Sequence, residues 1–293
     1  MDAADLTLFA AVARSGGINK AARALNTVQS NVTQRVRTME DELGVKLFHR
    51  HSRGVTLTDA GAQLLPYAER IGALIDEARR AATDEKVPRG RLCIGSLETT
   101  AARRLPPILA GYAQEFPEVD IVLETGTTAE LIDRVVERRL EGAFVAGPVE
   151  QPELVIERIL TEELVLLTAP WIGNVASLLK RATRGEIDLK ILVLRAGCSY
   201  RRRLEDILAA RGIATPRRLE FGTVDGIVGC VAAGLGVTLL PRAVVERALR
   251  EGHIVAHALP RKESLVDTLF VRRRDAFVST ALARFLERTS RQA

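Results

Sequence analysis

The spacing of apolar residues changes near residue 90, and this change constrains the fold more than any other feature. Before it, apolar residues recur every three or four positions, which is typical of amphipathic helices. After it, short apolar runs such as "RLCIGSL" (91–97) and "GAFVAG" (142–147) alternate with helical stretches. Such alternation favours an α/β fold with parallel sheets. A chain of 293 residues with a polar break at "TDEKVPRGRL" (83–92) is therefore expected to form two folded parts.

Three helices and a hairpin are predicted before residue 58. The helices are expected at 5–16, 18–25 and 29–43, with the turn "NTV" between the second and third. The residues of the third helix that we expect to face inward are Val32, Val36, Met39 and Leu43. The segment 46–58 then predicts two short strands around a turn at Ser52, Arg53 and Gly54. This order is that of a winged helix-turn-helix, although a three-helix bundle with a solvated polar face fits the same periodicity.

Polar and basic side chains gather on the third helix and the hairpin. Between Arg14 and Arg53 there are eight Lys/Arg residues and three acidic ones, a local excess that suits a polyanion. A helix fits the major groove of DNA, where Gln and Asn suit adenine and Arg suits guanine or phosphate. The candidate DNA-binding residues are Gln29, Ser30, Asn31, Thr33, Gln34, Arg35 and Arg37 on the helix, with Arg50 and Arg53 on the hairpin.

The segment 16–61 closely resembles the N-terminal domain of LysR-type transcriptional regulators. The matching features are Ala21-Ala22, Leu25, Gln29, Val32, Leu43-Gly44, Leu47-Phe48, Arg50, Leu57-Thr58 and Ala60-Gly61. Thr33 stands where the family usually has Ser, Gln34 where Arg is frequent, and Ser30-Asn31 replace a common Pro-containing pair. These departures concern which DNA sequence is read. The resemblance implies a sequence-specific DNA-binding transcriptional regulator whose activity is controlled by a small-molecule effector.

One long helix is predicted from Thr58 to about Lys86. Its apolar seam repeats at spacings of four and three residues, at Leu64, Ala68, Ile71, Ile75, Ala78 and Ala82. A seam with no partner nearby in the sequence predicts pairing with a second copy, and packing against its own domain is the alternative. In the resembled family this linker helix dimerises. A homodimer or homotetramer would place two third helices on an interrupted palindromic operator of double-stranded DNA. An activator of this kind would also contact RNA polymerase.

The expected domains are a winged helix-turn-helix at 1–58, a linker helix and hinge at 59–89, and a regulatory domain at 90–293. The resemblance implies that this last domain is like a type 2 periplasmic binding protein, with two lobes around a cleft. Lobe I is expected near 91–161 and 265–293, and lobe II near 162–264.

The ends of the predicted strands suggest where an effector would bind. In open α/β sheets, ligands bind beyond the carboxyl ends of the strands, against helix N-termini that suit small anions such as carboxylates. The candidate effector-binding residues are Ser96, Glu98, Thr99, Thr100, Thr127, Gly147, Cys198, Ser199 and Thr223. The hydroxyl residues among them could instead only cap helices, and the carboxylate of Glu98 leaves a cationic or polyfunctional ligand open.

Two alternative functions fit parts of the sequence. Cys198, at a predicted helix start beside Arg201, suits a redox-sensing regulator if Cys230 approaches it in space. A solute-binding module unrelated to transcription would lack the basic N-terminal domain and carry an export signal, whereas this chain starts "MDAADL". No nucleophile elbow, HExxH motif or metal-spaced cluster of His and Cys occurs, so neither an enzyme nor a cofactor or metal site is expected. A cytoplasmic protein with no membrane partner is expected.

Overall fold

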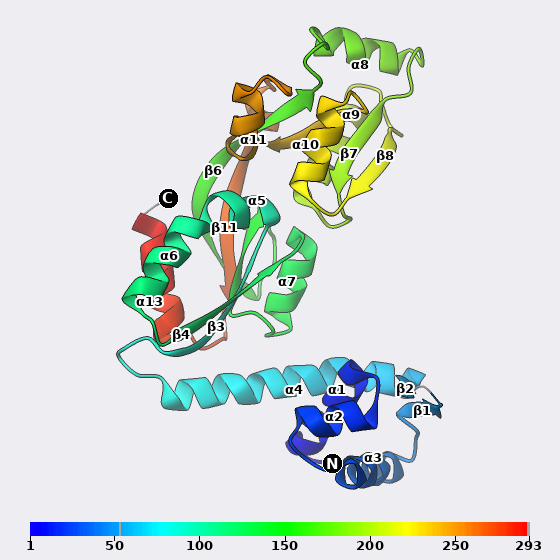
Figure 1. Cartoon of the computed structure of the whole chain (residues 1–293), viewed down its shortest axis with the longest axis vertical. Helices are drawn as coiled ribbons and strands as arrows, with labels where there is room; N and C mark the ends of the chain where they lie inside the picture. The colour runs from blue at the N-terminus through cyan, green and yellow to red at the C-terminus, as the bar shows by residue number, and fades with distance from the viewer. Residues whose placement is uncertain (53, 292–293) are drawn as a thin grey trace. The chain divides into compact units, whose positions relative to one another are not determined.

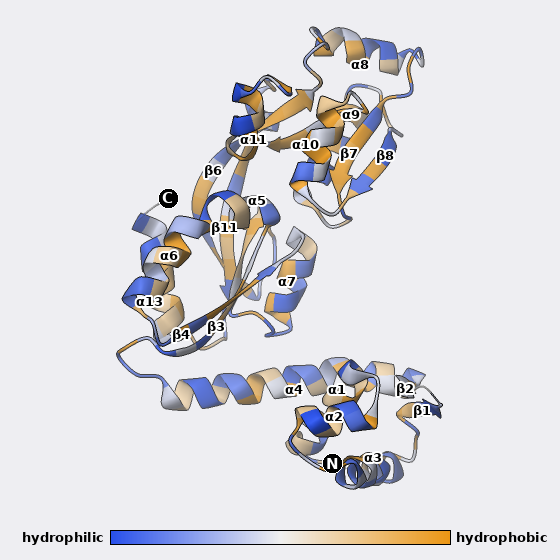
Figure 2. Ribbon diagram, in the orientation of Figure 1, coloured by the Kyte–Doolittle hydropathy of each residue, from blue (hydrophilic) through white to orange (hydrophobic). Residues whose placement is uncertain are grey.

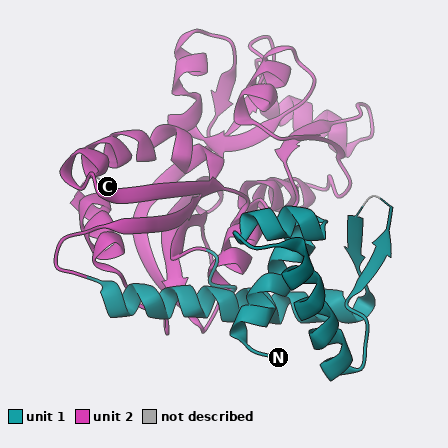
Figure 3. Ribbon diagram, turned by 60° about the horizontal axis from the view of Figure 1, so that its bottom comes forward, with its two compact units in different colours: residues 1–84, 137–139 teal, residues 85–136, 140–293 magenta. Residues whose placement is uncertain are grey.

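The computed structural model describes residues 1–52 and 54–291. The described chain forms two compact units, which Figure 3 colours separately. The first contains residues 1–84 and 137–139, and the second contains residues 85–136 and 140–293. Arg53 lies outside the described residues. Each unit is described by itself below.

The first unit begins with the three predicted helices and the predicted hairpin (Figure 1). Its elements are α1 (Ala3–Ser15), α2 (Ile18–Ala24), α3 (Gln29–Leu43), β1 (Phe48–His51), β2 (Gly54–Leu57) and α4 (Asp59–Thr83). Val32, Val36 and Met39 are buried against Phe9 and Val12 of α1, as predicted. The prediction for Leu43 was wrong, because that side chain is 39% exposed. Leu43 ends α3, and the chain then turns through Gly44 in the left-handed region, so that Leu47 enters the core instead.

The apolar residues of the long helix α4 are buried near its start and exposed further along. Ala68 is buried in the core of the first unit, and Leu64 packs against that core. Ile71 and Leu74 are 38% and 50% exposed. The alternative of packing against its own domain therefore holds for the start of the helix, whereas Ile71 and Leu74 are left largely uncovered.

The second unit contains the predicted strands and helices and two elements that the sequence pattern does not predict. Its elements are β3 (Gly90–Ser96), α5 (Glu98–Arg103), α6 (Leu105–Glu115), β4 (Val119–Thr125), α7 (Thr128–Val136), β5 (Gly142–Ala146), β6 (Leu154–Thr168), α8 (Val175–Thr183), β7 (Lys190–Leu194), α9 (Ser199–Ala209), β8 (Arg217–Phe221), α10 (Val224–Ala232), β9 (Thr238–Pro241), α11 (Arg242–Arg250), β10 (Val255–His257), α12 (Arg261–Ser264), β11 (Leu265–Arg273) and α13 (Thr280–Arg291). The two additional elements are α8 and α12. The chain breaks at Arg104 between α5 and α6, because Pro106 and Pro107 begin a new helix.

The sheets are mixed, so the prediction of parallel sheets was only partly right. Strands β4, β3 and β5 are parallel, but β11 lies antiparallel between β5 and β6. β6 is also antiparallel to β9 and β10. β7 and β8 form a separate parallel pair. β5 and β6 run in the same direction and β11 runs opposite to both, which the spacing of short apolar runs did not reveal.

The unit has two lobes that share strand β6. The first half of β6 pairs with β11, and its last residues pair with β9 and β10. Phe144, Phe270 and Phe285 meet in the core of lobe I, and Val165, Ile227 and Leu240 in that of lobe II. Figure 2 shows the hydrophobic colouring of β6 and β7 and the hydrophilic colouring of α3 in the first unit. In the described part of the chain, no helix is both long enough and apolar enough to cross a membrane.

Candidate functional sites: a nucleic-acid interface and an effector cleft

Helix α3 presents a polar surface of the first unit to solvent. Its buried side chains Val32, Val36 and Met39 fix which face is exposed. The exposed predicted residues of its first turns are Gln29, Ser30, Asn31 and Gln34, with Thr33 half-buried. The side chain of Asn31 donates to the Thr27 hydroxyl at 2.9 Å, so it holds the turn that precedes the helix.

Arg35 is turned toward the protein. Its Nε donates to the Asp5 carboxylate of α1 at 2.8 Å, and its Nη2 reaches Asp2 at 3.3 Å. Partial burial alone would raise the pKa of Asp5, but hydrogen bonds from the Asp2 N–H and Arg35 outweigh it and lower the pKa. Arg35 therefore joins α3 to α1. Arg37 is exposed and is the basic residue of this helix available to DNA.

Glu40 fixes the hairpin to the end of α3. It is only 4% exposed, and its two carboxylate oxygens accept from the Leu47 N–H and the Lys46 ammonium, both at 2.9 Å, and from the Phe48 N–H at 3.4 Å. Burial would raise the pKa of Glu40, but these hydrogen bonds outweigh it and lower the pKa. Sequence reasoning missed this role, because an acidic residue near the end of an amphipathic helix usually points to solvent.

The hairpin is held at a second point by Gly54. The N–H of Val55 donates to the Gly16 carbonyl at 3.0 Å, and a Cβ on Gly54 would lie 2.3 Å from that carbonyl oxygen. Gly54 also has a φ of +143°, which an L side chain rarely adopts. Arg50, on the paired strand, is exposed. The prediction for Arg53 falls outside the described residues.

A cavity of about 260 Å³ lies between the two lobes of the second unit. Lobe I contributes residues of α5 and of the loop after β4, and lobe II contributes the loop after β7 and the start of α10. The predicted effector residues that line it are Glu98, Thr99, Thr127, Cys198 and Thr223. Five of the nine predicted residues are thus brought together at one cleft.

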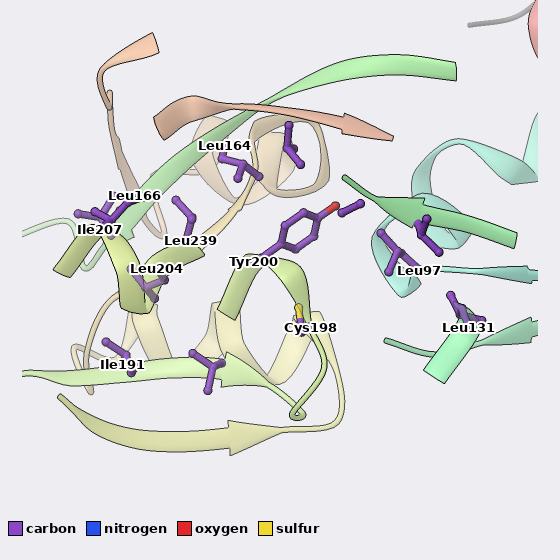
Figure 4. Close-up of a cluster of buried hydrophobic side chains, with 14 of the residues drawn as sticks. Leu97, Leu131, Leu164, Leu166, Ile191, Cys198, Tyr200, Leu204, Ile207 and Leu239 are labelled. Atoms are coloured by element: carbon purple, nitrogen blue, oxygen red, sulfur yellow. The ribbon is translucent and has the colours of Figure 1, made fainter. Parts of the chain in front are cut away.

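Two hydrogen bonds cross this cleft. The Thr99 hydroxyl and the Tyr200 hydroxyl are 3.3 Å apart, and the Glu98 carboxylate accepts from the Val224 N–H at 3.1 Å. Figure 4 shows the Tyr200 ring extending from the start of α9 toward the side that carries Leu97. Burial is the largest cause of the raised pKa of Tyr200, so its hydroxyl is a neutral donor or acceptor at any physiological pH.

Arg195 lines the cleft and was missed by sequence reasoning, and Tyr200 lines it beside the candidate residue Cys198. Arg195 follows β7, is exposed, and makes no ion pair with the residues that the structure describes. Its position directly after an apolar strand was the available signal. Thr127 and Thr223 both cap helices as well, since their hydroxyls accept from the Glu130 and Gly226 N–H groups at 3.3 and 3.2 Å.

Four predicted effector residues do not line the cleft. The hydroxyl of Ser96 is fully buried and donates to the Leu97 carbonyl at 3.0 Å. Ser199 donates to the Thr128 hydroxyl, also at 3.0 Å, beneath the cleft. Gly147 lies against Leu269, and Thr100 lines a different cavity. These corrections share one cause: strand ends locate an edge of a sheet but not the direction of each side chain there.

Cys198 is a neutral thiol in the cleft wall. It is 7% exposed, and burial is the main cause of its raised pKa, which disfavours the reactive thiolate. Cys230 packs against the core of lobe II, whereas Cys198 belongs to a different cluster, so the two thiols are not placed together. These observations count against the redox-sensing alternative.

Comparison with known proteins identifies the family. Residues 85–293 match the LysR substrate binding domain, and residues 3–62 match the bacterial regulatory helix-turn-helix protein of the lysR family. The chain belongs to the LysR family of transcriptional regulators. It is 45% identical over 281 residues to the HTH-type transcriptional regulator GltR of Bacillus subtilis, covering 96% of this chain and 93% of that one. It is 39% identical to YofA of the same organism, covering 98% of each chain.

Solved structures of LysR regulators share the fold. A full-length variant of OxyR from Pseudomonas aeruginosa matches with a TM-score of 0.69 and 20% identity, over 100% of this chain and 94% of that one. Full-length CbnR in complex with its target DNA matches with a TM-score of 0.67 and 24% identity, over 100% of both chains. The protein is thus a LysR-family transcriptional regulator with a DNA-binding helix-turn-helix and an effector-binding domain.

Proposed function

We propose that this LysR regulator binds an interrupted palindromic operator as a homodimer or homotetramer, under the control of a small anionic effector in the interlobe cleft. The observation that carries the effector part is the cleft lining. It joins the exposed guanidinium of Arg195 with hydroxyl groups from both lobes. An anion there would gain charge-assisted hydrogen bonds from groups that are already in place.

The DNA contacts are assigned from exposure. Gln29, Ser30, Thr33 and Gln34 are proposed to read base edges from the first turns of α3. Arg37, Arg50 and Arg53 are proposed to contact phosphates or the minor groove.

The dimer is proposed to form along the second half of α4. Tyr67, Ile71 and Leu74 are exposed apolar side chains on that helix, and a second copy of the same helix would cover them. Two α3 helices would then meet two half-sites one or more helical turns apart. If the protein activates transcription, RNA polymerase is its further partner.

Binding titrations on an operator and its single-base variants test the DNA part. Replacing Gln29 by Ala should relax the preference at one base pair, at a cost of about 1–3 kcal/mol. Replacing Arg50 by Met should weaken binding to all DNA sequences equally and reduce the salt dependence of the affinity. If the Gln29 variant kept full discrimination, its base-reading role would be wrong.

The effector part is tested by thermal-shift screening with small mono- and dicarboxylates and inorganic phosphate. The Arg195→Gln and Thr99→Val variants should each respond only at raised concentrations, with operator affinity in the absence of effector unchanged. Lys180→Gln is the matched control, because it removes an exposed charge on α8 outside the cleft. Equal responses of Arg195→Gln and Lys180→Gln would show that the cleft does not hold the anion.

A further inference from the structure

A groove on the second unit lies between residues 86–88, which follow the first unit along the chain, and the C-terminal helix α13. It has a volume of about 500 Å³ and is also lined by Glu115 and Phe116 at the end of α6. Figure 1 shows α6 and α13 side by side. Among the described residues, the groove and the interlobe cleft share no lining residue. The groove is therefore a separate candidate site.

The groove carries an excess of positive charge. Its basic residues are Lys86, Arg284, Arg288 and Arg291, and its acidic residues are Glu115 and Glu287. Both carboxylates are already paired, Glu287 with Arg284 at 2.9 Å and Glu115 with Arg288 at 2.6 Å. Lys86 and Arg291 are exposed, and neither makes an ion pair with the residues that the structure describes. Two cationic side chains therefore line the groove with no carboxylate to neutralise them.

The guanidinium of Arg288 is fixed in the groove from two sides. Its Nη1 donates to Glu115, and its Nη2 lies so close to Gly111 of α6 that a Cβ there would overlap it. Glycine inside a helix is destabilising relative to alanine, and here it leaves the space that the guanidinium occupies. Arg288 Nε is buried with no hydrogen-bond partner among the described residues, which is also destabilising and rare in native proteins. A charge held in place against these two costs is expected where it serves binding.

Three arginines of α13 lie on one face of the helix, at positions 284, 288 and 291. Spacings of four and three residues make side chains neighbours on a helix surface. At 1.5 Å per residue, the row from Arg284 to Arg291 spans about 10 Å. Positive charge spread over this length suits an extended anion with several charges better than a single phosphate or carboxylate. Guanidinium groups match phosphate oxygens with paired hydrogen bonds, so a chain of phosphates fits this row.

We propose that this groove binds an oligophosphate chain, either the triphosphate of a nucleotide or an inorganic polyphosphate. Lys86 and Arg291 supply the charges that are not neutralised within the protein, beside the fixed guanidinium of Arg288. The ligand joins residues 86–88 to α13 and so restrains the segment that follows the first unit. This assignment does not depend on what the interlobe cleft binds.

The test is calorimetric titration of the full chain with sodium tripolyphosphate in about 0.15 M salt, where weak contacts between exposed charges are largely screened. The double variant Lys86→Gln/Arg291→Gln should bind the probe at least about tenfold more weakly than the parent, the loss expected for hydrogen bonds to charged groups. Its melting temperature without the probe should be unchanged, because neither side chain is paired. Orthophosphate should bind the parent at least about tenfold more weakly than tripolyphosphate, because it cannot span the row of arginines.

Gly111→Ala tests the position of the fixed charge. This variant keeps every charge of the groove but displaces the Arg288 guanidinium, so it should bind tripolyphosphate severalfold more weakly. Lys180→Gln is the control, because it removes an exposed charge on α8 outside the groove and should bind as the parent does. Equal losses in Lys180→Gln and in the double variant would show that the probe responds only to net charge, and would overturn the proposal.

Two further variants separate the groove from the other candidate anion sites of the chain. Arg37→Met on α3 and Arg195→Gln in the interlobe cleft should both bind tripolyphosphate as the parent does. The proposal would be overturned if the parent did not bind the probe, or if either variant lost binding while the double variant kept it. Loss in Arg37→Met would place the phosphates on the DNA-binding surface, and loss in Arg195→Gln would support the proposed effector site instead.

Titration with ATP distinguishes the two sources of the phosphate chain. Val87 is 65% exposed and lines the groove with Phe116, which offers apolar surface that a nucleobase would cover. Tighter binding of ATP than of tripolyphosphate would support a nucleotide. Equal or weaker binding of ATP would support an inorganic polyphosphate.

Discussion

Replacing Glu40 by Gln should loosen the hairpin from α3 in the first unit. The carboxylate is buried and serves two backbone N–H groups and the Lys46 ammonium. Gln keeps the size and one acceptor oxygen, but its NH₂ group would face a donor. Hydrogen bonds to a charged group contribute about 1.5–3 kcal/mol each, and part of that remains with the amide oxygen. A loss of about 2 kcal/mol is expected.

The pH dependence of this loss has a definite sign. The pKa of Glu40 is lower in the folded protein than in an unfolded chain, where it is about 4.3. Its contribution to stability is therefore fully present above the unfolded value and is lost as the pH falls through the folded value. The difference between parent and variant should be constant near pH 7 and shrink below about pH 4.

Hydrogen exchange at the Leu47 and Phe48 amides measures this effect locally. A loss of about 2 kcal/mol corresponds to about thirtyfold faster exchange at neutral pH. Asp41→Asn is the control, because it removes an exposed carboxylate one residue away and should leave exchange unchanged. The reasoning would fail if these amides exchanged equally slowly in Glu40→Gln and in the parent at pH 7. It would also fail if the difference in exchange rate persisted below about pH 4.

Four further variants test the first unit. Changing Ile71 and Ile75 together to Glu should halve the mass measured by light scattering, since each buried aliphatic side chain contributes about 1.5–3 kcal/mol; an unchanged mass would mean that α4 does not pair. Gly54→Ala should destabilise the first unit by about 1–3 kcal/mol, because of the positive φ and the nearby Gly16 carbonyl, and a melting curve like the parent's would contradict this. Arg35→Met should lower stability by about 1 kcal/mol and leave operator binding intact. Arg37→Met should leave stability unchanged and weaken binding to all operator sequences alike. Weaker operator binding by Arg35→Met would restore its predicted DNA contact.

The helices of the first unit could be predicted because local signals agree with the tertiary structure. The range 29–43 was predicted for α3, and Gly44 ends it in the left-handed conformation. Glu40 and Arg35 could not be assigned in this way. Their partners lie at Leu47 and at Asp5, and no periodicity links those positions. Burial of a charged group depends on long-range pairing, which a single sequence does not contain.

The cleft could be predicted only in part for a related reason. Strand ends indicated Thr99, Thr127 and Cys198, which do line it. They could not separate Thr99 from Thr100, because on a helix two neighbouring residues point about 100° apart and the rotation of α5 is set by packing. The prediction that Ser96 lines the cleft was wrong for the same reason, since alternate residues of a strand face opposite sides of the sheet.

Helix α5 is one element through which a ligand in the interlobe cleft can affect the arrangement of the lobes. Three of its six residues bond to lobe II: Glu98 to the Val224 N–H, Thr99 to Tyr200, and Arg103 to Glu246. A ligand shifts an equilibrium only by contacts that differ between two states. An anion beside Thr99, or one that draws Arg103 from Glu246, changes such contacts directly. The Ser199 hydroxyl of lobe II also donates to Thr128 of lobe I, so an effector that displaced Ser199 would change a further contact between the lobes.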